Sequence, residues 1–268
     1  MEPARVPLWC DGLWAALQIL DASWEITRWN LREGVPDRTL LSTIDGILGW
    51  GAFRSPVDQY MHIAHYLQPK LPIGLCIGGT AMPIQHADDY SVLFFETFWH
   101  KQQLPGDLNL KHAFGVHRKV YQKPNKADFE VLQRLAIWDY LSVGSFSRWK
   151  RHEKLLSMRG TKLAIGEIQH GNLQESIDII GDLLLGGVAV SDMVPAEKLA
   201  TLYATVGAVY IPAELHGGGE RAVLEARSCG AKVIVEEDNP KLKELVTSPI
   251  YDEQYYADRL KEGMEACL

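Results

Sequence analysis

The stretch from Ala208 to Val235, AVYIPAELHGGGERAVLEARSCGAKVIV, decides the fold that this sequence predicts. Residues 208–212 form a short apolar run rich in β-branched and aromatic side chains, which is typical of a buried strand. Three glycines, 217–219, come next, and residues 220–229 then carry good helix formers up to another glycine. Residues 232–235 begin a second strand. The stretch therefore predicts a strand, a glycine turn, a helix and a strand.

The glycine turn is the first candidate for a ligand site. In a parallel α/β sheet, ligands bind at the carboxyl ends of the strands. Gly217, Gly218 and Gly219 let backbone N–H groups approach a ligand closely, and the N-terminus of the following helix favours an anion. We expect a phosphate-binding site here. The alternative is a tight connection between strand and helix that binds nothing.

Composition excludes several classes of protein. Of the 268 residues, 47% are hydrophobic and 23% are charged, which is typical of a soluble globular protein. The formal net charge is -7 with no basic tract, which disfavours binding to nucleic acid or to an anionic membrane surface. No apolar run approaches the roughly 20 residues of a membrane span, and the N-terminus lacks the apolar core of a signal peptide. We therefore expect a cytoplasmic protein.

The metal-binding residue types show no metal-binding pattern. The nine histidines form no HExxH or similar zinc motif, and Asp88-Asp89 is interpreted as a solvated acidic pair. The sequence thus predicts neither a metal nor a cofactor. We expect reduced thiols at the four cysteines, which lack metal-ligand spacing: Cys10, Cys76, Cys229 and Cys267.

Residues 1–120 read as a shortened α/β domain. Repeated alternation of strands and helices argues for a parallel sheet that is covered on both faces. The expected strands are 6–10, 24–29, 45–51, 72–77, 90–95 and 110–116. The expected helices are 13–20 and the segment from 56 to 66.

Residues 121–268 read as a second domain, since 121–126 is a polar, proline-containing linker. Its regular alternation is of the Rossmann type. Besides those of the opening stretch, the expected strands are 139–144, 162–166 and 188–191. The other expected helices are 127–137, 152–158, 173–185, 195–203, 239–246 and 252–264.

Polar and aromatic residues gather at predicted strand ends in the first half. Trp50 and Trp99 are the best of its tryptophans for stacking on a sugar, because an indole offers both a flat face and an N–H donor. The alternative for each is core packing or an oligomer contact. The remaining candidates on this side are Gly78, Gly79, Glu96 and His100.

Several short motifs of the chain resemble, in order, those of the GT-B glycosyltransferases, closest to glycosyltransferase family 4. The resemblance covers about residues 111–246. The segments AFGV (113–116), VGSFSRWKR (143–151), AIGE (164–167) and VPAEKLA (194–200) are similar to the family's "nGVD", "vGRlvxxKG", "ivGeG" and "vpxeeLa". The opening stretch resembles "PSxxEGFGLxxLEAmAcGxPVI".

The resemblance implies two Rossmann-like domains with parallel sheets facing across a cleft. It implies that Lys150 neutralises the donor diphosphate, that Glu225 hydrogen-bonds the donor ribose, and that the backbone N–H groups of residues 217–219 hold phosphate or sugar oxygens. The further donor-side candidates are Gly12, Ser145 and His216. The candidates for catalysis are Lys150, Arg148 and Glu220.

The chain also departs from the family pattern. Counting back from Glu225, the first of the family's paired glutamates falls on Gly217, with Glu214 and Glu220 out of register. The arginine of the lysine loop falls on Ser145, and Arg148 is the alternative source of that charge. Gly78-Gly79 stand in place of the family's histidine, for which the substitutes are His86, His100 and His216, or none if these are structural.

The sequence thus predicts a metal-independent, retaining glycosyltransferase that moves a sugar from a nucleoside-diphosphate sugar to a hydroxyl of a glycan or small molecule. The missing glutamate, arginine and histidine motivate an alternative, a non-catalytic homologue that binds a nucleotide or glycan. A GT-B sugar-nucleotide epimerase is a third interpretation. The aromatic residues of the first half leave room for a homo-oligomer or for peripheral contact with the inner face of a membrane.

Overall fold

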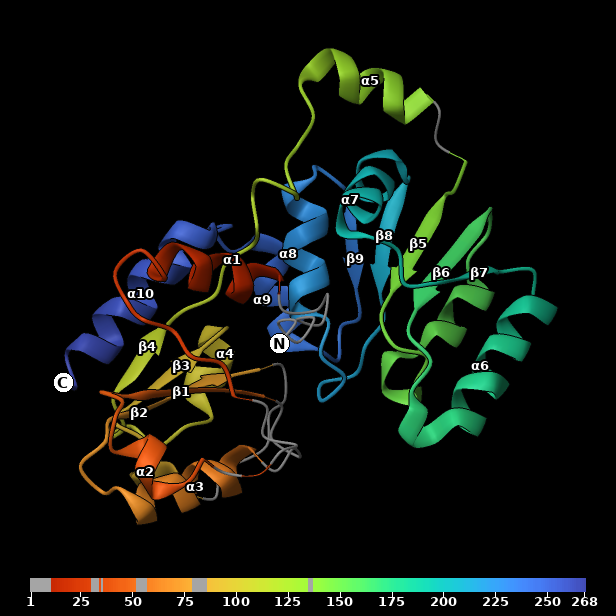
Figure 1. Ribbon diagram of the computed structural model, residues 1–268. Coiled ribbons are helices and arrows are strands. Elements are labelled where there is room, and N and C mark those ends of the chain that lie inside the picture. Colours follow the sequence, from red (N-terminus) through yellow and green to blue (C-terminus); the bar gives the residue numbers. More distant parts are fainter. Residues whose placement is uncertain (1–10, 30–33, 35, 52–56, 79–85, 135–136) are drawn as a thin grey trace. The chain divides into compact units, whose positions relative to one another are not determined.

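A computed structural model describes residues 11–29, 34, 36–51, 57–78, 86–134 and 137–268 (Figure 1). Its contacts divide the chain into two compact units. One unit holds residues 12–115 and 251–268, and the other holds residues 1–11 and 116–250. The expected strand at 6–10 lies outside the described residues.

The 12–115 unit is built on a four-stranded parallel sheet in the order β1-β2-β3-β4. Its strands are β1 (Ile47–Gly51), β2 (Ile73–Ile77), β3 (Val92–Phe95) and β4 (Leu110–His112). Its helices are α1 (Asp11–Leu20), α2 (Arg38–Leu41), α3 (Val57–Leu67), α4 (Phe98–Gln102) and α10 (Glu253–Glu265), with a 3-10 turn η3 (Ala87–Asp89).

Helices cover both faces of this sheet. Figure 1 shows α3 on one face and α1 with α10 on the other. On the α3 face, Leu41, Met61 and Leu75 belong to one buried apolar cluster. On the other face, glycines let α10 lie close to the strands: a Cβ at Gly74 would stand 2.5 Å from the sulfur of Met264. This close packing ties the last helix of the chain to the first sheet.

Residues 24–29 form no strand, so that prediction is wrong. The alternation of large side chains reflects packing on helices of the unit. The indole Nε1 of Trp24 donates to Oε1 of Glu265 over 3.3 Å. The guanidinium of Arg28 lies 3.3 Å from the centre of the Trp14 ring, a cation–π contact.

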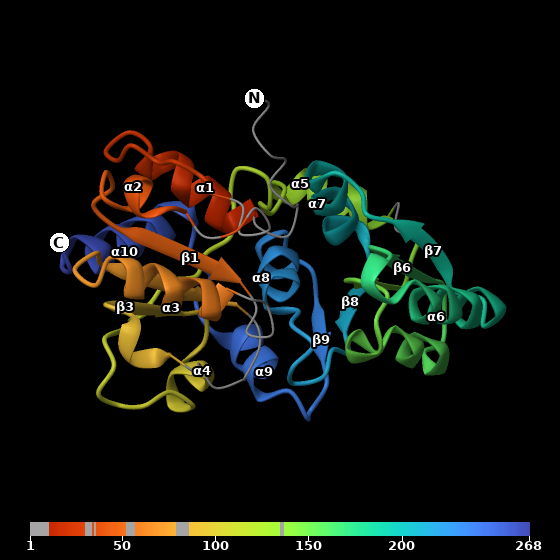
Figure 2. The ribbon, with the colours of Figure 1, turned by 60° about the horizontal axis from the view of Figure 1, so that its bottom comes forward.

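The 116–250 unit is built on a five-stranded parallel sheet in the order β7-β6-β5-β8-β9. Its strands are β5 (Tyr140–Val143), β6 (Lys162–Gly166), β7 (Ala189–Asp192), β8 (Ala208–Ile211) and β9 (Val233–Val235). Its α-helices are α5 (Lys126–Arg134), α6 (Leu173–Leu185), α7 (Ala196–Thr205), α8 (Glu220–Ser228) and α9 (Pro240–Thr247). Figure 2 shows α8 alongside β9, on which it packs. This strand order is that of a Rossmann sheet.

The loop after β5 runs through two 3-10 segments, η4 (Arg148–Lys150) and η5 (His152–Ser157). The α-helix expected at residues 152–158 is thus a 3-10 segment. Another 3-10 segment, η6 (His170–Asn172), precedes α6.

The two units differ from the expected division at residue 120. Residues 116–120 belong with the second unit, and residues 251–268 belong with the first unit. The reason lies in α10, whose buried residues Tyr256, Leu260 and Met264 recur at helical spacing, and which packs on β2, β3 and β4. In the described ranges, no helix reaches the length and apolarity that crossing a membrane requires.

Candidate functional site

The candidate site lies where the strand order of the five-stranded sheet reverses, between β5 and β8. The chain leaves β5 toward β6 on one side and leaves β8 toward β9 on the other, which makes this edge a topological switch point. The two loops that follow touch each other: the backbone N–H of Glu214 donates to the carbonyl of Trp149 over 2.9 Å. Residues of the β5 loop and of the glycine turn therefore meet at the carboxyl edge of the sheet.

Lys150 reaches from the first loop to the second. Its side chain lies over Gly144, where a Cβ would stand 3.1 Å from Cδ of the lysine. Its Nζ lies beside Gly218, where a Cβ would stand 3.2 Å from that nitrogen and 3.6 Å from Oε2 of Glu220. The structure thus brings together the lysine, the glycine turn and the start of α8.

A group of charges surrounds this lysine. Burial lowers the pKa of Lys150 to about 8, an effect that Glu220 opposes and that Lys241 and Arg221 strengthen. Glu220 forms an ion pair with Lys241, and both side chains are buried. The lysine at the mouth of the turn is therefore an ammonium at neutral pH and loses its proton at mildly alkaline pH.

The three glycines of the turn have different roles. Gly217 donates its N–H to the carbonyl of Glu214 over 2.8 Å, and a Cβ there would stand only 2.2 Å from the carbonyl oxygen of Trp149. Gly218 and Gly219 have φ values of +72° and +107°, a region that favours glycine. The N–H groups in the first turn of α8 have no acceptor within the helix. Of the three backbone N–H groups predicted to bind phosphate or sugar oxygens, that of Gly217 already donates to a carbonyl within the turn.

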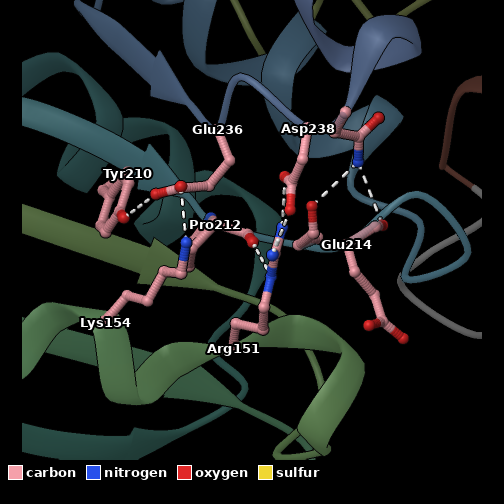
Figure 3. Close-up of polar contacts among 9 residues, drawn as sticks. Arg151, Lys154, Tyr210, Pro212, Glu214, Glu236 and Asp238 are labelled. Atoms are coloured by element: carbon pink, nitrogen blue, oxygen red, sulfur yellow. Dashed lines mark hydrogen bonds and ion pairs between the residues drawn. The ribbon is translucent and has the colours of Figure 1, made fainter.

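A polar network holds these loops against the ends of β8 and β9 (Figure 3). Arg151 makes a two-bond pair with Asp238, with Nη1–Oδ2 and Nη2–Oδ1 distances of 2.7 and 2.8 Å. Its Nε donates to the carbonyl of Pro212 over 2.6 Å. Beside it, Lys154 pairs with Glu236 at 2.6 Å, and Tyr210 donates its hydroxyl to the same carboxylate.

The pKa values of this network follow its geometry. The hydrogen bond to Asp238 raises the pKa of Arg151. Burial raises the pKa of Glu236, but the bonds from Lys154 and Tyr210 outweigh it and leave the value lowered. Sequence reasoning missed the network, because the basic residues after β5 are visible in the sequence whereas their partners depend on the strand order.

Two buried polar residues fix the backbone of the loops. Asn239 caps α9 and donates to the carbonyls of Ala213 and Glu214 over 2.9 and 3.0 Å. His152 lies 2.9 Å from the hydroxyl of Ser142 through Nδ1 and 3.2 Å from the carbonyl of Ser145 through Nε2. Burial, and then Lys150, lowers the pKa of His152 to about 4. A neutral ring with its proton on Nε2 satisfies both contacts.

Other predicted donor-side residues have partners of their own. Arg148 is 83% exposed and pairs with Glu175 at the start of α6, with Nε–Oε2 at 3.3 Å. The buried carboxylate of Glu225 lies 3.3 Å from Nε of Arg221 and 3.5 Å from the hydroxyl of Tyr203.

The three further donor-side candidates lie in the loop after β5, in the glycine turn and in α1. The hydroxyl of Ser145 lies 3.1 Å from that of Ser147. His216 is exposed in the glycine turn. Gly12 lies in the first turn of α1, within the 12–115 unit.

The acceptor-side candidates share the carboxyl edge of the four-stranded sheet. Trp50 lies near the end of β1, opposite Cys76 of β2, and Gly78 follows β2. Trp99 and His100 lie in the short helix after β3, where the buried His100 ring contacts the Thr97 hydroxyl at 3.1 Å. Gly79 lies outside the described residues.

His112, at the end of β4, joins this edge and was not predicted. Its Nδ1 lies 2.9 Å from the hydroxyl of Tyr255, and its Nε2 lies 3.2 Å from the carbonyl of Glu96. Its ring stacks on the 54% exposed Phe98. Burial lowers the pKa of His112. Part of Phe98 is left as an exposed aromatic surface beside Glu96.

The structure is similar to several solved structures, although no protein-family model and no curated protein matches the sequence. The crystal structure of Anabaena HepE in complex with UDP and glucose is 13% identical, with a TM-score of 0.58 over 85% of this chain and 73% of that chain. Sucrose-phosphate synthase from Thermosynechococcus elongatus is also 13% identical, with a TM-score of 0.58 over 91% and 72%. This chain has the GT-B fold.

The structure is also similar to one that is described under another activity. A protein described as a UDP-N-acetylglucosamine 2-epimerase, from Listeria monocytogenes, is 11% identical, with a TM-score of 0.50 over 84% of this chain and 74% of that chain. Identities of 11–13% establish the fold alone.

Proposed function

We propose that this protein is a glycosyltransferase whose donor is a nucleoside-diphosphate sugar and whose 116–250 unit binds that donor. One observation carries the proposal: the ammonium of Lys150 lies beside Gly218 in front of α8, at the switch point of the sheet. A lysine and a helix N-terminus facing the same space provide two positive poles for one diphosphate. Complexes of HepE with UDP and with UDP-glucose support this class of ligand.

The proposed reaction is metal-independent and retains the configuration of the sugar. As the bond between sugar and phosphate breaks, negative charge grows on the leaving diphosphate. Lys150 and the N–H groups at the start of α8 stabilise that charge without reorganising, which is the differential stabilisation that catalysis needs. A phosphate oxygen of the leaving group takes the proton of the acceptor hydroxyl, so that the protein supplies no nucleophile.

Glu225, which is proposed to contact the donor ribose, already has a partner in the structure. The carboxylate is 5% exposed and pairs with Arg221 one helical turn earlier. A ribose that reaches Glu225 has to displace Arg221 from it, or bind beside the pair. Glu225→Gln is therefore expected to weaken binding of a nucleotide more than binding of inorganic pyrophosphate.

A non-catalytic homologue is the competing function, and Gly217 favours it. In the family pattern this position carries the sugar-contacting glutamate, but here no side chain fits, because the carbonyl of Trp149 occupies the space. A transferase of this kind has to hold its sugar with other groups. An epimerase remains the third alternative, and it would release nucleotide without any acceptor.

Nucleotide binding by calorimetry tests the proposal. The diphosphate UDP is expected to bind more tightly than UMP, because the second phosphate reaches Lys150. Lys150→Ala should weaken UDP binding by about tenfold or more, the usual cost of a charged hydrogen bond. The exposed Lys198 of α7 is the matched control, and Lys198→Ala should bind as the wild type does. If the wild type and Lys150→Ala bind UDP with equal affinity, the assignment of the donor site to Lys150 is wrong.

Activity distinguishes the three functions once binding is established. A set of nucleotide sugars is incubated with and without a mixture of sugar acceptors, and the anomeric proton signals are followed by NMR. Release of nucleoside diphosphate only when an acceptor is present identifies a transferase. Release without an acceptor identifies an epimerase or a hydrolase. A donor that stays intact while bound identifies a binding protein.

A further inference from the structure

The geometry points to a binding site for a divalent transition metal ion, with Zn²⁺ as the reference ion, formed by His62, His86 and Asp89 in the 12–115 unit. One ligand atom from each of these residues lies within 4.8 Å of the other two. His62 comes from α3, whereas His86 and Asp89 flank and end the 3-10 turn η3. The site would therefore link two segments that are separated in the sequence.

The donor set selects a class of ion. Two imidazoles and one carboxylate suit zinc and its neighbours among the transition metals, whereas calcium and magnesium take mainly oxygen ligands. Three protein ligands leave a position for water on a tetrahedral zinc ion. His62 has a side chain that is 43% exposed and Asp89 one that is 20% exposed, so the ion can enter from solvent.

The ligands are already close without an ion. Nδ1 of His62 lies 2.5 Å from Oδ2 of Asp89. The rings of His62 and His86 are stacked, with centroids 3.9 Å apart and an angle of 11° between planes. The stacking brings a ring nitrogen of each imidazole within 4.8 Å of the other and of the Asp89 carboxylate, so one ion can contact all three.

The scaffold around the site is also in place. Asp58 and His62 lie one turn apart on α3, and Asp58 accepts a hydrogen bond of 2.6 Å from the hydroxyl of Tyr90, next to Asp89. His65, a turn further on, has its Nε2 3.9 Å from the other oxygen of Asp89. One face of α3 is thus held against η3 by groups outside the three ligands.

Binding needs only a small rearrangement. Two donors on one tetrahedral zinc ion stand about 3.3 Å apart, given metal–ligand bonds of about 2.0–2.1 Å. The ion would enter between Nδ1 of His62 and Oδ2 of Asp89, widen their 2.5 Å separation, and draw the His86 nitrogen inward. Binding is thus expected to release protons and to weaken as the pH falls. None of these residues belongs to the proposed donor site.

Titration of the full chain with ZnCl₂ by calorimetry tests the site. We expect one saturable site per chain and a rise in the melting temperature. His86→Ala, which removes a ligand, should weaken zinc binding by at least about 100-fold, and His65→Ala, whose ring lies 3.9 Å from the ligand carboxylate, by less than His86→Ala. The half-buried His117 offers the matched control, and His117→Ala should bind zinc as the wild type does.

Cobalt gives a second readout, independent of heat. Co²⁺ at a site with two imidazoles should produce visible absorption that His86→Ala and Asp89→Asn both lose, while circular dichroism shows that each variant remains folded. Saturation only at millimolar zinc, or equal zinc affinity in His86→Ala and wild type, would overturn the site. If both variants unfold, His62→Gln is measured in their place by the same criteria.

Discussion

Arg151 and Asp238 form a two-bond ion pair that joins the loop after β5 to the loop after β9. Arg151 also has a left-handed backbone, with φ of 52°, and its Nε holds the carbonyl of Pro212. A lysine cannot make three such bonds from one planar group. Because Asp238 is 60% exposed, we expect Arg151→Lys to lower the free energy of unfolding by only about 1 kcal/mol.

Urea denaturation measures this loss, and Arg148→Lys in the same loop is its control. Arg148 is 83% exposed, so its replacement should leave the unfolding midpoint unchanged. A double-mutant cycle that combines Arg151→Met with Asp238→Asn isolates the pair, because each substitution removes one of its charges. Additive effects of Arg151→Met and Asp238→Asn would show that the pair contributes no coupling energy.

Nucleoside-diphosphate binding should weaken above pH 8. Burial lowers the pKa of Lys150 to about 8, so the lysine is an ammonium below this pH and neutral above it. A phosphate has its second pKa near 6, so the ligand charge is constant in that range. Between pH 7 and pH 9 the affinity for UDP should fall by up to about tenfold, one pKa unit being worth about 1.4 kcal/mol. Calorimetry at both pH values measures the fall.

The variant that isolates this effect is Lys150→Arg, since a guanidinium keeps its charge at pH 9. The UDP affinity of Lys150→Arg can differ from that of the wild type, but it should vary little between pH 7 and pH 9. A pH dependence that persists unchanged in Lys150→Arg would assign the titration to another group.

Glu220→Gln should strongly destabilise the 116–250 unit. The substitution leaves the charge of Lys241 buried without the carboxylate with which it pairs. Breaking one side of a buried pair costs about 3–5 kcal/mol. Chemical denaturation measures this, with Glu237→Gln, whose side chain is 89% exposed, as the variant that should unfold like the wild type.

The same substitution should move the pH dependence of Lys150. Glu220 raises the pKa of Lys150, so its loss lowers that pKa further. In Glu220→Gln, UDP binding should therefore begin to weaken at a lower pH than in the wild type. If the midpoint of the pH dependence of UDP binding stays the same in Glu220→Gln, Glu220 does not affect the pKa of Lys150.

Gly217→Glu should not restore a family-like site. Any Cβ at this position meets the carbonyl of Trp149 at 2.2 Å, so Gly217→Ala alone should cost about 1–3 kcal/mol, as for other overpacked sites. Gly181 is the matched control because a Cβ there meets nothing within 4 Å. In the middle of α6, Gly181→Ala should stabilise by about 0.5–1 kcal/mol. Thermal unfolding of both alanine variants shows whether Gly217→Ala lowers the melting temperature while Gly181→Ala raises it.

Much of the fold could be predicted because its signals are local. The run at 208–212, the glycine turn and the helix formers after it lie in one continuous stretch, and the structure places β8 and α8 there. The convergence of Lys150 with Gly218 could also be anticipated, since both follow parallel strands and so reach the same edge of one sheet.

The rest depended on contacts between distant segments. The alternation of large and small side chains at 24–29 is the same whether the large residues pack in a sheet or contact helices. Trp24 contacts a helix, through its hydrogen bond to Glu265. The cluster of His62, His86 and Asp89 has no recognisable spacing because two separate segments supply it. The partners of Arg148 and Glu225 likewise follow from packing of the helices.

The placement of α10 bears on the order in which the chain can fold during synthesis. Residues 12–115 are made before residues 116–250, yet α10, which shares one face of their sheet with α1, is made from residues 253–265. At the usual rates of about 5–20 residues per second, the part of that face on which α10 packs stays uncovered for about 7–27 s while residues 116–250 emerge. The nascent first unit thus exposes an apolar sheet surface that a chaperone could recognise, and the 116–250 unit can complete its own core before the first unit does.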